Sequence, residues 1–184
     1  MSSSNSHKQK QTQKQAKPTQ IGLLGENLVA AWLQNNGWEI IARRWRCRWG
    51  EIDIIAGELS DRPSPQASYQ RIAFVEVKTR NHRSWDAGGL LSINAQKQAK
   101  LLQTAEIFLS DRPDLSDRPC QFDIALVRVR YQRRSPTNPG TSSSNSSNSS
   151  SLITLGQPIS MKDATGEYEL TLHNYIAGAF EADT

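Results

Sequence analysis

Apolar positions that recur every three or four residues predict a first helix over residues 18–36. Pro18 suits the first turn of a helix, and Gly37 suits a left-handed cap beyond its end. The apolar side chains cover most of the circumference, so we expect burial on two sides of this helix. They are Leu23, Leu24, Leu28, Val29, Ala31, Trp32 and Leu33.

An alternation of apolar and polar residues follows the helix and predicts extended structure over residues 38–57. Within it, Trp45, Cys47 and Trp49 alternate with arginines, which is typical of a strand with one face in water. Gly50 should follow a turn or bulge between two strands. Residues 71–80 are apolar and β-branched, and they predict a third strand.

Beyond residue 90 the pattern predicts a helix that Ser92 caps and that runs to about Leu109. Further strands are expected over residues 121–130 and 152–155. A helix, three strands, a helix and two strands, in that order, predict a single α/β domain with a mixed β-sheet flanked by helices.

Three polar stretches lack the apolar residues needed for a core. We expect residues 1–20 to be a disordered basic, Gln-rich tail, and residues 58–70 and 132–151 to be flexible insertions of a domain over residues 21–180. The formal net charge of +4 equals the charge of the four lysines in residues 1–20, which contain no acid. The domain itself is therefore neutral, so its charge balance permits a polyanionic partner without requiring one.

Several classes of protein are excluded by composition. The sequence contains no apolar run of about 18 residues, so we expect no membrane association. Its first residues lack the apolar segment of a secretory signal. Cys47 and Cys120 are too few for a disulfide framework, so a reducing cytoplasm is the expected location.

Ionisable residues interrupt two segments that should be central strands. Glu76 and Lys78 should share one face of FVEVK, and Asp53 should lie opposite Ile52 and Ile54 in GEIDII. A buried carboxylate without a partner costs several kcal/mol, so these groups need an explanation. One alternative is structural: an ion pair between Glu76 and Lys78 at a strand end, with the other acids facing solvent.

Glu26 is a third acid in an apolar context. Its neighbours one turn away are Leu23, Val29 and Ala30, although its carboxylate could also reach past the helix edge to water. Carboxylates from a helix and two strands offer only oxygen donors, which suit Mg²⁺ or Mn²⁺. Such an ion could polarise a phosphate and lower the pKa of an attacking water.

An acid on one strand followed by E-x-K on the next resembles the PD-(D/E)xK superfamily of restriction-endonuclease-like proteins. A longer match runs in order from about Ile21 to Val129, with a weaker echo at 175–180. It is similar to the YraN-like family of uncharacterised bacterial proteins. The matching segments are GENLVAAWLQNNGWEIIARRWRCRWGEIDIIA, FVEVKTR, the Lys97–Ala105 helix and QFDIALV.

The resemblance implies a restriction-endonuclease-like core and a metal-dependent endonuclease acting on nucleic acid, with DNA as the expected substrate. Asp53 and Glu76 match the metal-binding acids, and Lys78 matches the lysine that positions water or phosphate. Glu26 matches the acid on the first helix, a further catalytic and metal-binding candidate. Arg44-Trp45 departs from the pattern, because an asparagine is expected in that stretch.

Arg46, Arg48, Arg80 and Lys97 are candidate nucleic-acid contacts. The tryptophans beside the first two could stack bases, or they could simply pack in the core. Lys97 lies one turn before Leu101 and could approach a phosphate, or it could be a surface lysine. Two other functions stay open: a non-catalytic nucleic-acid-binding module and a protein-interaction scaffold. The sequence leaves the oligomeric state open.

Overall fold

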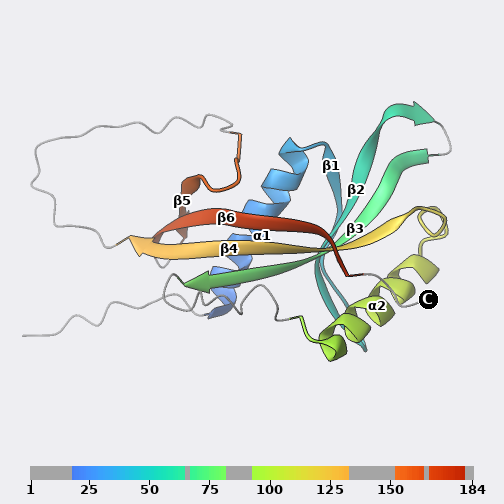
Figure 1. Cartoon of the computed structure of the whole chain (residues 1–184), viewed down its shortest axis with the longest axis horizontal. Coiled ribbons are helices and arrows are strands. Elements are labelled where there is room, and N and C mark those ends of the chain that lie inside the picture. Colours follow the sequence, from blue (N-terminus) through green and yellow to red (C-terminus); the bar gives the residue numbers. More distant parts are fainter. Residues whose placement is uncertain (1–17, 65–66, 82–92, 133–151, 164–165, 181–184) are drawn as a thin grey trace, which may run out of the picture.

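Helices cover both faces of a mixed sheet in the computed structural model, which describes residues 18–64, 67–81, 93–132, 152–163 and 166–180 (Figure 1). The elements in chain order are α1 (Pro18–Asn35), β1 (Trp38–Cys47), β2 (Gly50–Ser64), β3 (Ala67–Asn81), α2 (Ala95–Ser110), β4 (Cys120–Gln132), β5 (Pro158–Asp163) and β6 (Gly166–Phe180). The predicted α/β class and the mixed sheet flanked by helices are confirmed.

The described strands form one sheet in the order β1-β2-β3-β4-β6-β5. All neighbours are antiparallel except β3 and β4, which pair in parallel from Ile72–Cys120 to Asn81–Val129. A parallel pair needs a crossover connection, and the segment that contains α2 provides it. This crossover carries α2 past the strands that hold Asp53 and Glu76.

Two apolar clusters lie on opposite faces of the sheet. The first includes Leu28 and Leu33 of α1 together with Val75 and Val127. The second includes Phe108 of α2 with Ile72, Phe74 and Phe122. Because β3 contributes Val75 to one cluster and Phe74 to the other, it is a central strand with both faces covered.

The first helix begins and ends almost where the sequence predicts, and Gly37 has the left-handed φ of 83° expected beyond a helix end. Burial is less complete than expected, because Leu23 stays 40% exposed. At Gly25 the helix lies very close to β3. A Cβ atom on Gly25 would collide with Thr79 Oγ1, whereas a Cβ atom on Gly22 would meet nothing. This contact fixes the height of Glu26 above the sheet.

The expected flexible insertion over residues 58–70 is extended structure on both sides of residues 65–66. Leu59 pairs with Tyr69, and Arg71 Nε lies 2.6 Å from Glu58 Oε2. Tyr69 also packs on Gly57. Prolines and polar residues suggested a loop, but the Tyr69 ring and the ion pair between Arg71 and Glu58 hold β2 and β3 together. Residues 18–20 of the expected tail over residues 1–20 begin α1, and residue 132 of the expected insertion over residues 132–151 ends β4. The rest of the tail and of the Ser/Asn tract, residues 1–17 and 133–151, lies outside the described residues.

The C-terminal part departs most from the sequence-based prediction. Residues 152–155 are not a strand, and β5 and β6 follow instead. The first half of β6 alternates polar residues with the buried Tyr168, Leu170 and Leu172, a pattern with one wet face. The cap of α2 is Asn94 rather than Ser92, and its Oδ1 accepts the Lys97 N–H at 2.9 Å. Neither described helix has the length and apolarity required to span a membrane.

Candidate functional site

The pairing between β2 and β3 begins at Ile54–Val75, and Asp53 lies just outside it. Its Oδ2 accepts the backbone N–H of Val77 at 2.7 Å. A side-chain carboxylate of β2 therefore takes the place of a backbone carbonyl as the acceptor for this N–H of β3. The sequence pattern placed Ile52 and Ile54 on one face, which is wrong. Ile52 packs in the α2 cluster and Ile54 in the α1 cluster, so the regular alternation of faces along β2 is broken at Asp53.

Glu76 is buried, with 6% of its surface exposed, and two lysines contact its carboxylate. Lys78 Nζ donates to Oε1 at 2.7 Å, and Lys97 Nζ lies 3.0 Å from Oε2. The ion pair between Glu76 and Lys78, which the sequence offered as the structural alternative, is therefore present. The second lysine comes from the first turn of α2, which joins this helix to the site.

The Asp53 carboxyl has an unusually high proton affinity. Burial, followed by the negative charge of Glu76, raises its pKa from 3.8 to about 7. The hydrogen bond from Val77 acts in the opposite direction without cancelling the effect. Asp53 and Glu76 are thus close enough to repel each other, as two carboxylates sharing one cation would in its absence.

Glu26 lies at the edge of the same region and is only 8% exposed. Burial raises its pKa, and the charges of Arg44 and Arg43 partly offset that rise. Its Oε2 lies 3.8 Å from Arg44 Nε and 3.9 Å from Arg43 Nη2, yet it accepts no hydrogen bond. A buried carboxylate oxygen without a donor is costly unless a ligand or water satisfies it.

Arg44 joins Glu26 to Glu51. Its Nε donates to Glu51 Oε1 at 3.1 Å, and its backbone has a φ of 49°, a left-handed conformation that arginine rarely adopts. Burial raises the pKa of Glu51, but hydrogen bonds from Arg46 and Arg44 outweigh it and leave the pKa below its ordinary value. Glu51 is therefore held ionised by arginines, unlike Asp53.

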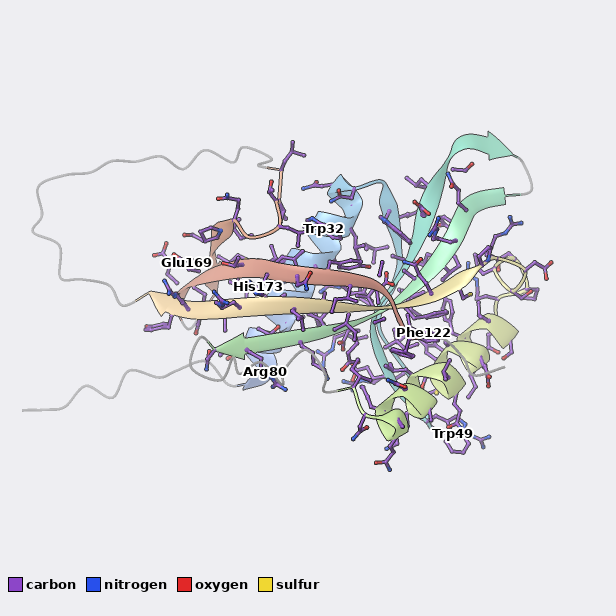
Figure 2. All side chains as sticks on the ribbon, in the orientation of Figure 1. Trp32, Trp49, Arg80, Phe122, Glu169 and His173 are labelled. Atoms are coloured by element: carbon purple, nitrogen blue, oxygen red, sulfur yellow. The ribbon has the colours of Figure 1, made fainter. Side chains whose placement is uncertain are left out.

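The candidate nucleic-acid contacts do not form one patch. Arg46 Nη2 lies 2.8 Å from Glu51 Oε2, and Arg48 lies over the exposed ring of Trp49. Figure 2 shows Trp49 near α2 and Arg80 far from it, at the end of β3. Trp45, in contrast, packs edge-on against Phe108 in the core. Lys97 contacts Glu76 and so belongs to the acidic site.

The carboxylate oxygens of Asp53 and Glu76 are the kind of ligand that suits a hard cation with few protein ligands. Among the described residues, no three His, Cys, Asp or Glu side chains are arranged to hold a metal ion. Asp53 and Glu76 remain as a pair of oxygen donors, and Mg²⁺ commonly binds through one or two carboxylates plus water and phosphate oxygens. The oxygens Glu26 Oε2 and Glu76 Oε2 are both buried and accept no hydrogen bond of regular geometry, although Lys97 Nζ lies 3.0 Å from Glu76 Oε2. Such a pair of carboxylates could hold a cation, with Glu26 reaching it through water.

Two features of the site have no signal in the sequence pattern. The Val77 N–H is a backbone group, so no side-chain pattern could reveal its bond to Asp53. Arg44 stood out in the sequence only where Arg44-Trp45 departs from the family pattern, and Arg43 did not stand out, although both face Glu26. The spacing of 17 residues from Glu26 to Arg43 carries no signal, because the sheet brings them together.

Comparison with known proteins finds similarity to one protein family and to its individual members. The model of the Uncharacterised protein family UPF0102 matches residues 25–127, which include all four proposed catalytic residues. A UPF0102 protein of Trichodesmium erythraeum is 47% identical over 161 residues, covering 86% of this chain and 87% of the relative. A second, from Acaryochloris marina, is 44% identical over 168 residues, covering 91% and 93%.

Proposed function

Because the chain belongs to the Uncharacterised protein family UPF0102, the YraN family, whose description names no activity, we propose a function from the site itself. It is a metal-dependent endonuclease that hydrolyses phosphodiester bonds of nucleic acid, with DNA as the expected substrate, on a restriction-endonuclease-like core. One observation carries the proposal. Asp53 and Glu76 come from adjacent strands, repel each other, and have Lys78 beside them.

In this proposal Asp53 and Glu76 hold Mg²⁺ or Mn²⁺, and Glu26 acts through a water molecule. The ion would supply a Lewis acid for the phosphate and lower the pKa of an attacking water. Asp53 can bind a cation through Oδ1 while Oδ2 keeps the Val77 N–H. That bond fixes the orientation of the carboxylate, and a fixed ligand loses less entropy when it binds.

Lys78 supplies the cationic group nearest to the acids. Its ammonium is 2.7 Å from Glu76 Oε1, and its side chain is 22% exposed. An ammonium in this position can donate a hydrogen bond to the attacking water or to a phosphate oxygen. It also stabilises the charge that develops on the phosphate in the transition state. Arg80 lies two residues further along β3 and could bind a neighbouring phosphate.

A second candidate function is a nucleic-acid-binding module without turnover. The observation in its favour is that Lys78 and Lys97 already neutralise Glu76. A structural ion-pair network could persist without any metal. The two functions differ in metal dependence, since a pure binding module should bind nucleic acid equally well in chelator and with Mn²⁺.

Cleavage assays with Mn²⁺ on linear, single-stranded, flapped and four-way DNA test the proposal. Wild type should produce cut strands, and Asp53→Ala and Glu76→Gln should not. Glu106→Gln is the matched control, because it makes the same carboxyl-to-amide change at an exposed position of α2. Cleavage that survives Asp53→Ala, or the absence of any product with binding unaffected by chelator, would reject the endonuclease.

A further inference from the structure

We propose that Lys97 is a switchable counter-ion: it neutralises Glu76 while no divalent cation is bound, and moves to a substrate phosphate when one binds. This inference rests on the proposed function and adds a regulatory step to it. Metal and nucleic acid would then bind cooperatively. The metal releases Lys97 from Glu76, and the phosphate of the nucleic acid accepts the released ammonium.

The first argument is the position of the ammonium. Lys97 Nζ lies 3.0 Å from Glu76 Oε2, which has no hydrogen bond of regular geometry. Glu76 Oε1 is engaged by Lys78 instead. A cation that used Glu76 Oε2 would therefore compete directly with the Lys97 ammonium for the same oxygen.

The second argument concerns which lysine leaves. Lys78 lies on the same strand as Glu76, and its side chain is 22% exposed. Lys97 reaches the site from the first turn of α2, and its side chain is 37% exposed. A long side chain already partly in water can move its ammonium outward at little cost. Lys97 is therefore the lysine that a metal displaces.

The third argument is charge. Two lysines and a divalent cation would bring a charge of +4 to a site with Asp53 and Glu76, so mutual repulsion opposes metal binding. A phosphodiester beside the metal supplies negative charge and an acceptor for the released ammonium. Nucleic acid should consequently tighten metal binding, and by linkage metal should tighten nucleic-acid binding by the same factor.

Calorimetric titration with Mn²⁺ tests the first half of the proposal. Lys97→Met keeps the length of the side chain and removes its charge, so it should bind Mn²⁺ roughly ten-fold more tightly than wild type. Lys100→Met, one turn away on the exposed side of α2, removes the same charge and should behave like wild type. Lys97→Gln should repeat the effect of Lys97→Met and guards against a folding defect in one variant.

The second half is tested with a labelled phosphorothioate duplex, which resists hydrolysis. In wild type and Lys100→Met, saturating duplex should tighten Mn²⁺ binding by about five-fold or more, and in Lys97→Met by much less. Equal or weaker Mn²⁺ binding by Lys97→Met, or coupling that Lys97→Met leaves unchanged, would overturn the inference. It would leave the proposed function standing if wild type still binds Mn²⁺ and Glu76→Gln does not. If neither wild type nor Lys97→Met binds Mn²⁺, both proposals fall.

Discussion

Asp53 of β2 accepts the backbone N–H of Val77 on β3 at 2.7 Å, so one of the proposed metal ligands also completes the sheet. A backbone carbonyl would satisfy the N–H equally well but would carry no charge. The Asp53 carboxylate brings a negative charge close to Glu76. The repulsion between them lowers the free energy of unfolding by an amount that depends on pH. Stability and proposed function are therefore linked at this bond.

Asp53→Asn should stabilise the metal-free protein at neutral and alkaline pH. The amide oxygen can still accept the Val77 N–H, but the charge is gone. The pKa of Asp53 is about 7 in the folded protein and 3.8 ordinarily. Wild type therefore loses stability as pH rises from about 4 to 7, while the variant does not. The gain should be near zero at pH 4 and about 2–4 kcal/mol at pH 8. Urea unfolding in chelator at several pH values measures it, and a gain independent of pH would contradict the assignment.

Metal affinity should fall steeply below pH 7. A proton and a divalent cation compete for Asp53, whose pKa is about 7. The apparent Mn²⁺ affinity should therefore fall by up to about ten-fold per pH unit between pH 7 and 5, and level off above pH 8. Calorimetry across this range checks the prediction. An affinity that is flat from pH 6 to 8 would mean that Asp53 is not a ligand.

Glu76→Gln should have the opposite effect on stability from Asp53→Asn. It leaves the ammonium groups of Lys78 and Lys97 without their shared carboxylate. Breaking such a partly buried network should cost about 1–3 kcal/mol in chelator. Thermal melts beside Glu106→Gln, which should be nearly neutral, measure the difference. A variant as stable as wild type would show that the lysine contacts contribute little to folding.

Gly25→Ala should destabilise the protein by about 1–3 kcal/mol, because the new Cβ atom collides with Thr79 Oγ1. Gly22→Ala is the matched control on the same helix. It meets no atom and should stabilise by up to about 1 kcal/mol through helix propensity. The double variant Gly25→Ala/Thr79→Ala should recover part of the loss. Equal effects at the two glycines would mean that α1 does not lie as close to β3.

Arg44→Asn should melt about 3 °C higher than Arg46→Asn. Both variants lose a contact with Glu51, but only Arg44 has a φ of 49°. Asparagine adopts this left-handed conformation more readily than arginine, so the change relieves backbone strain at one position only. Equal melting temperatures would indicate that the contacts of Arg44 with Glu26 and Glu51 compensate for the strain.

Local pattern predicted most of the fold. The two helices, the first three strands and β4 each follow from periodicity and from residues that suit helix ends. The strands β5 and β6 were missed because their alternation of polar and apolar residues also occurs in surface loops, and only pairing of β6 with β4 and of β5 with β6 makes them strands. The segment 58–70 was misjudged for a similar reason, since Leu59 and Tyr69 are isolated in sequence but opposite each other in the sheet.

The candidate site was predictable in its members and less so in its contacts. Glu26, Asp53, Glu76 and Lys78 stand out as ionisable residues in apolar surroundings. For Lys97 the sequence suggested only that its side chain could approach a phosphate. Its contact with Glu76 was not predicted, because the distance from α2 to Glu76 depends on the crossover between β3 and β4. The placement of Ile52 and Ile54 in different apolar clusters also depends on packing against two helices.

The parallel pairing of β3 with β4 has a consequence for synthesis on the ribosome. A chain that has emerged as far as Asn81 already contains Glu26, Asp53, Glu76 and Lys78, but lacks α2 and β4. Ile52 and Phe74 would then be exposed to solvent, because α2 and Phe122, which pack against them in the folded protein, come later in the chain. The four candidate catalytic groups therefore cannot reach their final arrangement until at least residue 132 has been made. Nascent chains halted before that point should expose apolar surface to chaperones and should lack the arrangement of the proposed metal site.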